Sequence, residues 1–213
     1  MTRFDYDSLP KKYNLYQTQK QESNFLFLDM ETNGEGGFSP PTQTPTQISW
    51  TVTTYDGTPI CERDYIVKGA ISIKPGLQNS LSIERIEKEG VPIGDALQEF
   101  YSMLRPIDII VCHNATFDVG LLLRYKSAPF PLTNVICTMR ELTNFCKLDH
   151  PSRFGYHQEY KWPRLNELAS CLKVKVESNK LHDSLYDCKI LQECFLKAMK
   201  MNLFEFTFIY ADK

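Results

Sequence analysis

The sequence lacks any run of about 18 apolar residues, the length that a membrane-spanning helix requires. Its first ten residues include Arg3, Asp5 and Asp7 and no apolar stretch follows them, so a secretory leader is not expected either. The seven cysteines contain no CxxC pair and no His–Cys spacing typical of a zinc site, which predicts reduced thiols. We therefore expect a soluble, intracellular protein without a membrane partner, in a compartment that the sequence leaves open.

Positive charge is also scarce, because 24 Lys and Arg stand against 26 Asp and Glu, for a net charge of −2. A protein that coats nucleic acid non-specifically needs a basic surface, so any nucleic-acid partner must be held locally. Gly and Pro, at 10 and 12 of 213 residues, are too few for a low-complexity chain. The 42% of hydrophobic residues, with 13 Phe and 11 Tyr, are enough for the core of one globular domain.

The spacing of apolar residues predicts an α/β fold in which helices cover a mixed sheet. Residues 25–28 are all apolar and end abruptly at Asp29, as in a strand buried on both faces. Asp56-Gly57 is a hairpin turn signal between two strand-like segments, so the first three strands are expected to be antiparallel. The predicted strands are residues 25–28, 48–55, 60–68, 108–112 and 135–137, with a loop over 33–47.

Helical spacing replaces the strand pattern after residue 76. The first predicted helix ends at 89. Four others span 93–104, 115–125, 163–172 and 182–200, and one more begins at 138. Pro163 is expected in the first turn of its helix, where proline is favoured. Residues 1–23 show no sustained period and are interpreted as an N-terminal extension. Residues 24–200 then form the domain, and 201–213 form a C-terminal tail whose aromatic residues predict either a strand or packing on the body.

Four carboxylates fall at the ends of predicted elements: Asp29, Glu31, Asp118 and Asp187. In an extended segment residues i and i+2 point to the same side, so Asp29 and Glu31 can face one metal ion together. Clustered carboxylates repel one another, and hard divalent cations such as Mg²⁺ or Mn²⁺ remove that cost. A pair of such ions stabilises both oxygens of a phosphodiester displacement. The pattern therefore indicates a two-metal phosphodiesterase site.

His182 lies five residues before Asp187, which brings the two close together if His182 begins the last helix. Its imidazole can accept a proton from an attacking water, because its ordinary pKa is near working pH. His113 has the same spacing from Asp118 but lies at a predicted strand end, before a turn through Asn114, so we do not assign it this role.

Three short segments combine these residues: FLDMETNG at 27–34, HNATFD at 113–118 and HDSLYD at 182–187, with VICTM at 135–139 in support. Together they resemble the exonuclease motifs of the DnaQ-like, DEDDh-type 3′-to-5′ exonucleases, in the same order and at similar separations. The resemblance covers roughly residues 24–200. The segment YKWPRLNEL at 160–168 is similar to a stretch in a subgroup of bacterial and large-virus members.

The resemblance implies an RNase H-like fold, with a mixed five-stranded sheet flanked by helices, two divalent metal ions and release of 5′-mononucleotides. Position by position it implies one general base, His182, and four metal ligands, which are Asp29, Glu31, Asp118 and Asp187. It further implies that the substrate is contacted by three residues, which are Thr32 and Asn33 at the terminal sugar and Asn114. Ser184 departs from the motif, which usually has Ala there.

From these observations we expect a metal-dependent 3′-to-5′ exonuclease that releases 5′-mononucleotides from single-stranded or frayed DNA 3′ ends by two-metal-ion hydrolysis. One alternative is a 3′-to-5′ exoribonuclease that trims RNA or degrades oligoribonucleotides, because Asn33 and Asn114 could serve either sugar. Another is a catalytically silent nucleic-acid-binding accessory domain, since a fold does not guarantee a function. The mildly basic residues 147–164 predict a solvated loop or a lip that contacts phosphates.

Overall fold

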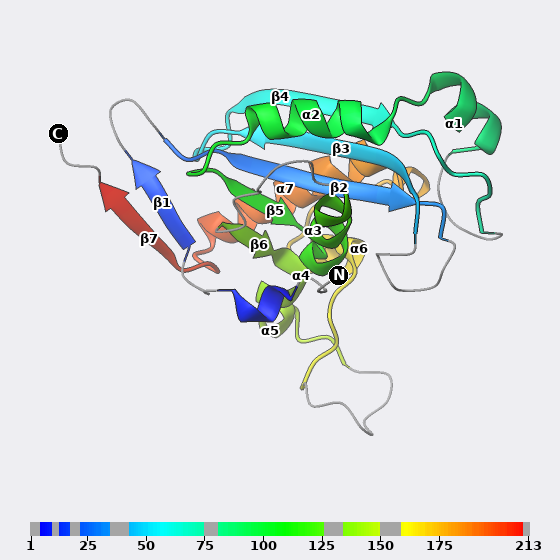
Figure 1. Cartoon of the computed structure of the whole chain (residues 1–213). Coiled ribbons are helices and arrows are strands. Elements are labelled where there is room, and N and C mark those ends of the chain that lie inside the picture. Colours follow the sequence, from blue (N-terminus) through cyan, green and yellow to red (C-terminus); the bar gives the residue numbers. More distant parts are fainter. Residues whose placement is uncertain are drawn as a thin grey trace.

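A five-stranded mixed sheet forms the centre of the molecule, with strand order β4-β3-β2-β5-β6 (Figure 1). The computed structural model describes residues 5–9, 13–17, 22–34, 43–74, 81–125, 134–149 and 159–210. The strands are β2 (Phe25–Thr32), β3 (Pro45–Thr53), β4 (Pro59–Ile66), β5 (Ile109–Cys112) and β6 (Val135–Cys137). β3 pairs antiparallel with both β2 and β4, whereas β5 pairs parallel with β2 and β6. The predicted mixed five-stranded sheet, with its antiparallel start, is confirmed.

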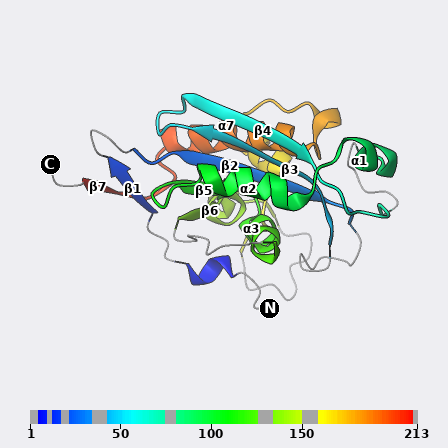
Figure 2. The ribbon, with the colours of Figure 1, turned by 45° about the horizontal axis from the view of Figure 1, so that its top comes forward.

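Helices cover both faces of this sheet. They are α1 (Ile83–Glu89), α2 (Ile93–Met103), α3 (Ala115–Arg124), α4 (Thr138–Glu141), α5 (Thr143–Cys146), α6 (Leu165–Cys171) and α7 (Ser184–Lys200). Figure 2 views the face that carries α2 and α3, with α7 behind the sheet. The described residues also contain two short 3-10 turns, Tyr6–Ser8 and Ser178–Lys180. Within the described residues, no helix combines the length and apolar character needed to span a membrane.

Strand β2 lies between two hydrophobic cores because its side chains alternate between the faces of the sheet. Leu26, Leu28 and Met30 join the core beneath α2 and α3, whereas Phe25 and Phe27 join the core beneath α6 and α7. Phe195 of α7 packs edge-on against both phenylalanines, with ring centroids 4.8 and 5.5 Å away. This aromatic packing holds α7 along β2 and so brings the first turn of α7 to the end of that strand.

The chain termini contribute a second, two-stranded sheet in which β1 (Tyr13–Gln17) pairs parallel with β7 (Phe206–Tyr210). In the N-terminal segment the Tyr6 hydroxyl is buried and bonds the Tyr13 hydroxyl at 2.6 Å and Glu141 Oε1 at 2.8 Å. The described parts of both termini therefore pack on the body, and the aromatic C-terminal segment forms a strand. Residues 1–4, 10–12, 18–21 and 211–213 lie outside the described residues. The boundaries at 23/24 and 200/201 stay a prediction.

Several predicted element boundaries were wrong. α7 begins at Ser184 and not at His182, because Asp183 Oδ1 caps the helix through the Tyr186 N–H at 3.0 Å. α6 begins at Leu165 and not at Pro163, because Glu167 Oε2 accepts from the backbone N–H of Arg164 at 2.8 Å and closes the first turn there.

Another difference is in β2, which continues beyond Leu28 to Thr32 because β3 pairs with it over Asp29, Met30 and Glu31. For the same reason β3 begins at Pro45, so the last three residues of the predicted loop 33–47 belong to a strand. Residues 35–42 of that loop lie outside the described residues, as do residues 150–158 of the basic stretch. All seven cysteines are free thiols, as predicted.

Candidate active site

The end of β2 supplies two carboxylates, Asp29 and Glu31, which lie two residues apart on one side of the strand. Pairing with β3 shifts register between Glu31 and Thr32, which indicates a β-bulge. Bulges bend a strand and redirect its side chains, and they are common beside active sites. The strand therefore presents Asp29 and Glu31 at the edge of the sheet where the parallel strands end.

The third carboxylate, Asp118, is in the first turn of α3, directly after β5. It is only 3% exposed, and its Oδ1 accepts a hydrogen bond from the backbone N–H of Met30 at 3.1 Å. This bond joins the second motif of the sequence to the first, because Met30 lies between Asp29 and Glu31.

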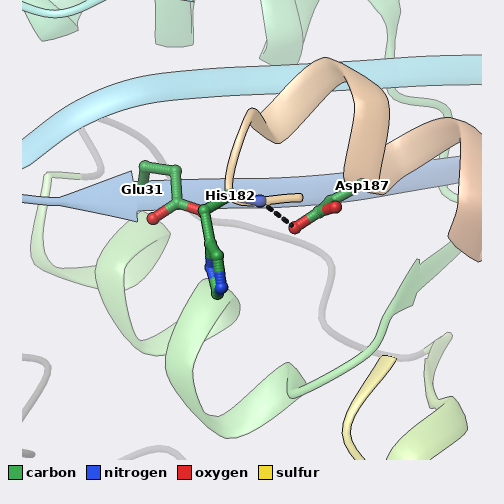
Figure 3. A group of neighbouring side chains, drawn as sticks. All are labelled: Glu31, His182 and Asp187. Atoms are coloured by element: carbon green, nitrogen blue, oxygen red, sulfur yellow. Dashed lines mark hydrogen bonds and ion pairs between the residues drawn. The ribbon is translucent and has the colours of Figure 1, made fainter. Parts of the chain in front are cut away.

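The fourth carboxylate, Asp187, lies in the first turn of α7, and its Oδ2 accepts from the backbone N–H of His182 at 3.1 Å (Figure 3). His182 has a positive φ of 67°, a left-handed conformation that reverses the chain before the helix begins. Its ring Nδ1 lies 4.0 Å from Glu31 Oε1, and its side chain is 48% exposed. Donor atoms of Glu31, His182 and Asp187 all lie within 4.8 Å of one another. The five residues that the sequence singled out thus face one cleft.

This cleft has a volume of about 710 Å³. One wall carries the four carboxylates and His182, and the exposed Asn114 lies on its rim. Residues 162–166, at the start of α6, also line the cleft, as do Ser178 and Leu181. The sequence did not place these residues in the site, and its signals there were the segment YKWPRLNEL at 160–168 and the mildly basic stretch that ends at Arg164.

Burial raises the pKa of every carboxyl in the group, and repulsion by the other members adds to the effect at Asp29 and Glu31. The pKa of Asp29 is held well above its ordinary value, first by burial and then by the charges of Asp118 and Glu31. Burial, followed by repulsion from Asp187 and Asp118, raises the pKa of Glu31 to about 8. Burial raises the pKa of Asp118 to about 8 and that of Asp187 to about 6. The charged cluster is therefore costly without a compensating positive charge.

Divalent metal ions fit this environment on two independent observations. Asp29 Oδ2 and Asp187 Oδ1 are buried and have no hydrogen-bond partner, which is unusual for carboxylate oxygens in a folded protein. Within the described stretches, no Lys or Arg forms an ion pair with any of the four carboxylates. Several converging carboxylate oxygens are the donor set preferred by hard cations such as Mg²⁺ and Mn²⁺.

His113, the second histidine in the cleft, has both ring nitrogens engaged. Its Nδ1 is 3.1 Å from the Thr138 hydroxyl, and its Nε2 is 3.0 Å from the Pro163 carbonyl, so Nε2 carries the proton and donates it. Burial lowers the pKa of His113 to about 4, which keeps the ring neutral. The ring therefore braces the chain at Pro163.

The predicted sugar-binding residues Thr32 and Asn33 are both 5% exposed and bond neighbouring residues of their own loop. The Thr32 hydroxyl donates to Gln43 Oε1 at 2.6 Å, and Asn33 Oδ1 accepts from the Thr44 N–H at 3.0 Å. Neither side chain lines the cleft, so any contact with substrate would come from their main chain or from a rearranged loop. Their role, like that of Asn114, stays a prediction.

Comparison with known proteins places these residues in a sequence family. The model of the RNase T family, described as exonuclease, matches residues 26–195, a range that contains all five converging residues. A protein of Mycobacterium tuberculosis (strain CDC 1551 / Oshkosh), named as a bifunctional exonuclease/endonuclease, is 29% identical over 175 residues. That alignment covers 79% of this chain and 25% of the relative, so the chain spans about a quarter of its length.

Solved structures of exonuclease I share the fold. A zinc-bound complex of Escherichia coli exonuclease I with single-stranded DNA aligns with a TM-score of 0.65 at 17% identity, over 85% of this chain and 42% of that one. Exonuclease I of Methylocaldum szegediense aligns with a TM-score of 0.63 at 16% identity, over 84% and 40% of the two chains. This likeness confirms the RNase H-like arrangement, in a chain that spans less than half the length of these relatives.

Proposed function

The chain belongs to the RNase T exonuclease family, and from this we propose that it is a metal-dependent 3′-to-5′ exonuclease. It releases 5′-mononucleotides from single-stranded or frayed DNA 3′ ends by hydrolysis, with two divalent cations as cofactors. The observation that carries the proposal is the convergence of four carboxylates and one exposed histidine on a single cleft. Three of these residues come from segments 70 or more positions away from Asp29, so their meeting is a property of the fold.

Asp29, Glu31, Asp118 and Asp187 would hold the cations. When bound, Mg²⁺ or Mn²⁺ supplies positive charge that stabilises the attacking and leaving oxygens of the displacement. The orphaned oxygens of Asp29 and Asp187 are the first candidates for ligands, because they are already desolvated and make no other bond. Hydrogen bonds from the main chain hold the carboxylates of Asp118 and Asp187 in place, so little reorganisation accompanies binding.

His182 acts as the general base that takes a proton from the attacking water. Its ring is half exposed and can reach water in the cleft, while the left-handed backbone and the bond to Asp187 fix its main chain. The 4.0 Å separation between its Nδ1 and Glu31 Oε1 lets the carboxylate stabilise the imidazolium that forms. Proton transfer by a positioned imidazole contributes about 10²- to 10⁴-fold to the rate of a hydrolytic step.

A single-stranded end suits the cleft because paired bases would have to separate before a terminal nucleotide could enter. Asn114 on the rim and the main chain at Thr32 and Asn33 are the proposed contacts to the terminal sugar. The structural relatives described with single-stranded DNA and with a dA16 oligonucleotide support DNA as the substrate class for this chain. RNA of the same sequence is tested beside DNA, because the alternative function is that of an exoribonuclease.

The decisive experiment uses single-stranded DNA and RNA of one sequence, labelled at the 5′ end, with Mg²⁺, Mn²⁺ or EDTA. Attack from the 3′ end yields a ladder of shortening labelled products, whereas attack from the 5′ end releases the label at once as a mononucleotide. We expect the ladder with DNA and either cation. His182→Ala should slow it by about 10²- to 10⁴-fold.

Glu87→Gln, an exposed change in α1, serves as the matched control and should retain full activity. Cleavage that persists in EDTA would contradict the role of the carboxylates as metal ligands. A ladder with RNA alone would replace the DNA assignment with an exoribonuclease. Binding of 3′ ends without product release by the wild-type protein would instead indicate a silent accessory domain.

A further inference from the structure

Trp162 is a large aromatic side chain that lines the same cleft as the carboxylates. It is 40% exposed, whereas the other tryptophan of the chain, Trp50, is fully buried beneath α2. Trp162 borders two hollows, namely the candidate active site and a neighbouring hollow of about 410 Å³. A tryptophan ring that is partly exposed in the cleft offers a large, rigid face for contact with a ligand there.

The backbone around this ring is held on both sides. Before it, the Lys161 N–H donates to the Leu148 carbonyl at 3.0 Å, and Lys161 Nζ pairs with Glu167 Oε1 at 2.5 Å. After it, the buried His113 ring donates to the Pro163 carbonyl at 3.0 Å. A side chain between two such anchors is presented in a fixed direction, which lowers the entropic cost of any contact that it makes.

A cation covers one face of the ring. The Arg140 guanidinium carbon lies 3.7 Å from the Trp162 ring centroid, and Arg140 also forms an ion pair with Asp7 at 3.2 Å. Arg140 lines the neighbouring hollow but not the candidate active site, so the guanidinium covers the side of the ring that is turned away from the cleft. Trp162 itself also lines the cleft, so the ring is accessible from there.

Positive charge accompanies this open side. Arg164, two residues further along, is exposed and lines the cleft, and it forms no ion pair with the carboxylates of the described stretches. An aromatic face beside an unpaired guanidinium is the combination that binds a base and an adjoining phosphate of single-stranded nucleic acid.

We propose that Trp162, backed by Arg140, is a stacking site for the base of a nucleotide upstream of the terminal one, and that Arg164 pairs with the phosphate beside that base. This inference deepens the proposed function, because it assigns the site that grips the strand while the carboxylate wall hydrolyses the end. Stacking accepts any base, so the site provides affinity without sequence preference.

Binding is measured first, in a His182→Ala background with Mg²⁺, on dT12 and on an abasic 12-mer that has the same phosphates but no bases. Trp162 emission should be quenched by dT12 and not by the abasic strand, and the buried Trp50 provides a constant background. By anisotropy of labelled strands, Trp162→Leu should weaken dT12 binding by about 5- to 150-fold, the equivalent of about 1–3 kcal/mol per stacked base.

Two further variants separate stacking from a structural role. Trp162→Phe retains an aromatic face and should bind dT12 within a few-fold of the parent, whereas Trp162→Leu should bind the abasic strand as the parent does. Arg164→Gln should weaken both strands alike and reduce the salt dependence of binding by about one phosphate contact. Equal loss on both strands with Trp162→Leu, or equal dT12 affinity of parent and Trp162→Leu, would overturn the stacking site.

The last test measures hydrolysis by a protein in which Trp162→Leu is the single substitution. Trp162→Leu should raise KM for dT12 and leave unchanged the hydrolysis of thymidine 5′-monophosphate p-nitrophenyl ester, which has no upstream base. An equal loss on both substrates would count against the stacking site. If the wild-type protein cleaves neither substrate, the proposed function fails, and the binding measurements still decide whether Trp162 stacks on bases.

Discussion

Replacement of Glu31 by Gln is expected to stabilise the metal-free protein at alkaline pH, although it removes a residue of the candidate site. The carboxyl is mostly buried, with 17% of its side chain exposed, and its pKa in the folded chain is about 8 against an ordinary 4.5. At about 1.4 kcal/mol per pKa unit, this difference corresponds to an upper bound of about 5 kcal/mol in the free energy of unfolding.

The direction follows from proton binding. Between about pH 4.5 and pH 8 the folded chain keeps the Glu31 proton and the unfolded chain has released it. Because the unfolded state then binds fewer protons, the free energy of unfolding falls as pH rises through this window. Below the window both states are protonated and the contribution is fully present. Gln has no proton to lose, so the variant lacks this part of the decline.

The assay is urea unfolding in EDTA at pH 5, 6, 7 and 8, followed by far-UV circular dichroism. Relative to the wild type, Glu31→Gln should gain on the order of 2–4 kcal/mol between pH 5 and pH 8, since relaxation and water entry reduce the full value. For a chain of this length that equals a difference of roughly 5–15 °C in Tm. The exposed Glu87→Gln should track the wild type.

Added Mg²⁺ provides a second readout at pH 8. A cation that binds only the folded state stabilises it by mass action, so the wild type should gain more than Glu31→Gln, which has lost a ligand. Parallel pH curves for the wild type and Glu31→Gln in EDTA would refute the idea that carboxylate repulsion destabilises the site. Equal stabilisation by Mg²⁺ would refute the place of Glu31 among the ligands.

Three other outcomes are expected. His113→Ala should lower the free energy of unfolding in urea by on the order of 1–3 kcal/mol, because two buried partners lose a hydrogen bond. The shape of the pH–rate profile above pH 5.5 should stay unchanged, since the His113 ring is already neutral there. Phe195→Ala should cost about 3–5 kcal/mol by the same measurement, because it opens a cavity between α7 and β2. Tyr6→Phe should cost about 1–3 kcal/mol, since it removes the hydroxyl that two buried or half-buried partners share. An unchanged free energy of unfolding would show that these hydroxyl contacts add nothing to stability.

Much of the sheet could be predicted from the sequence because strand formation leaves a local trace. The apolar run before Asp29, the turn at Asp56-Gly57 and the short apolar segments near residues 110 and 136 each identify a strand without knowledge of its neighbours. Helix starts were less predictable, because they depend on caps. His182 matches the motif spacing of a helix start, yet the side chain of Asp183 caps α7 and leaves His182 in a left-handed turn.

Some residues of the candidate site could likewise be predicted from the sequence, and others could not. Asp29, Glu31, Asp118, His182 and Asp187 were found from residue type and spacing, since charges at the ends of apolar elements stand out in a sequence. The stacking role that we propose for Trp162 was not found, although the segment 160–168 was singled out, because Arg140 lies 22 positions away and only the fold brings it against the ring. The pairing of β1 with β7 escaped for the same reason, as it joins the two ends of the chain.

The sequence by itself thus determined which chemical groups are present, which of them end strands and which family they belong to. The tertiary structure decided how far those groups are desolvated, which oxygens are left without partners and which aromatic face is open to the cleft. The physical reason is one of range. Periodicity and turn chemistry act over a few neighbouring residues, whereas burial and electrostatic repulsion depend on every group that the folded chain brings within several ångströms.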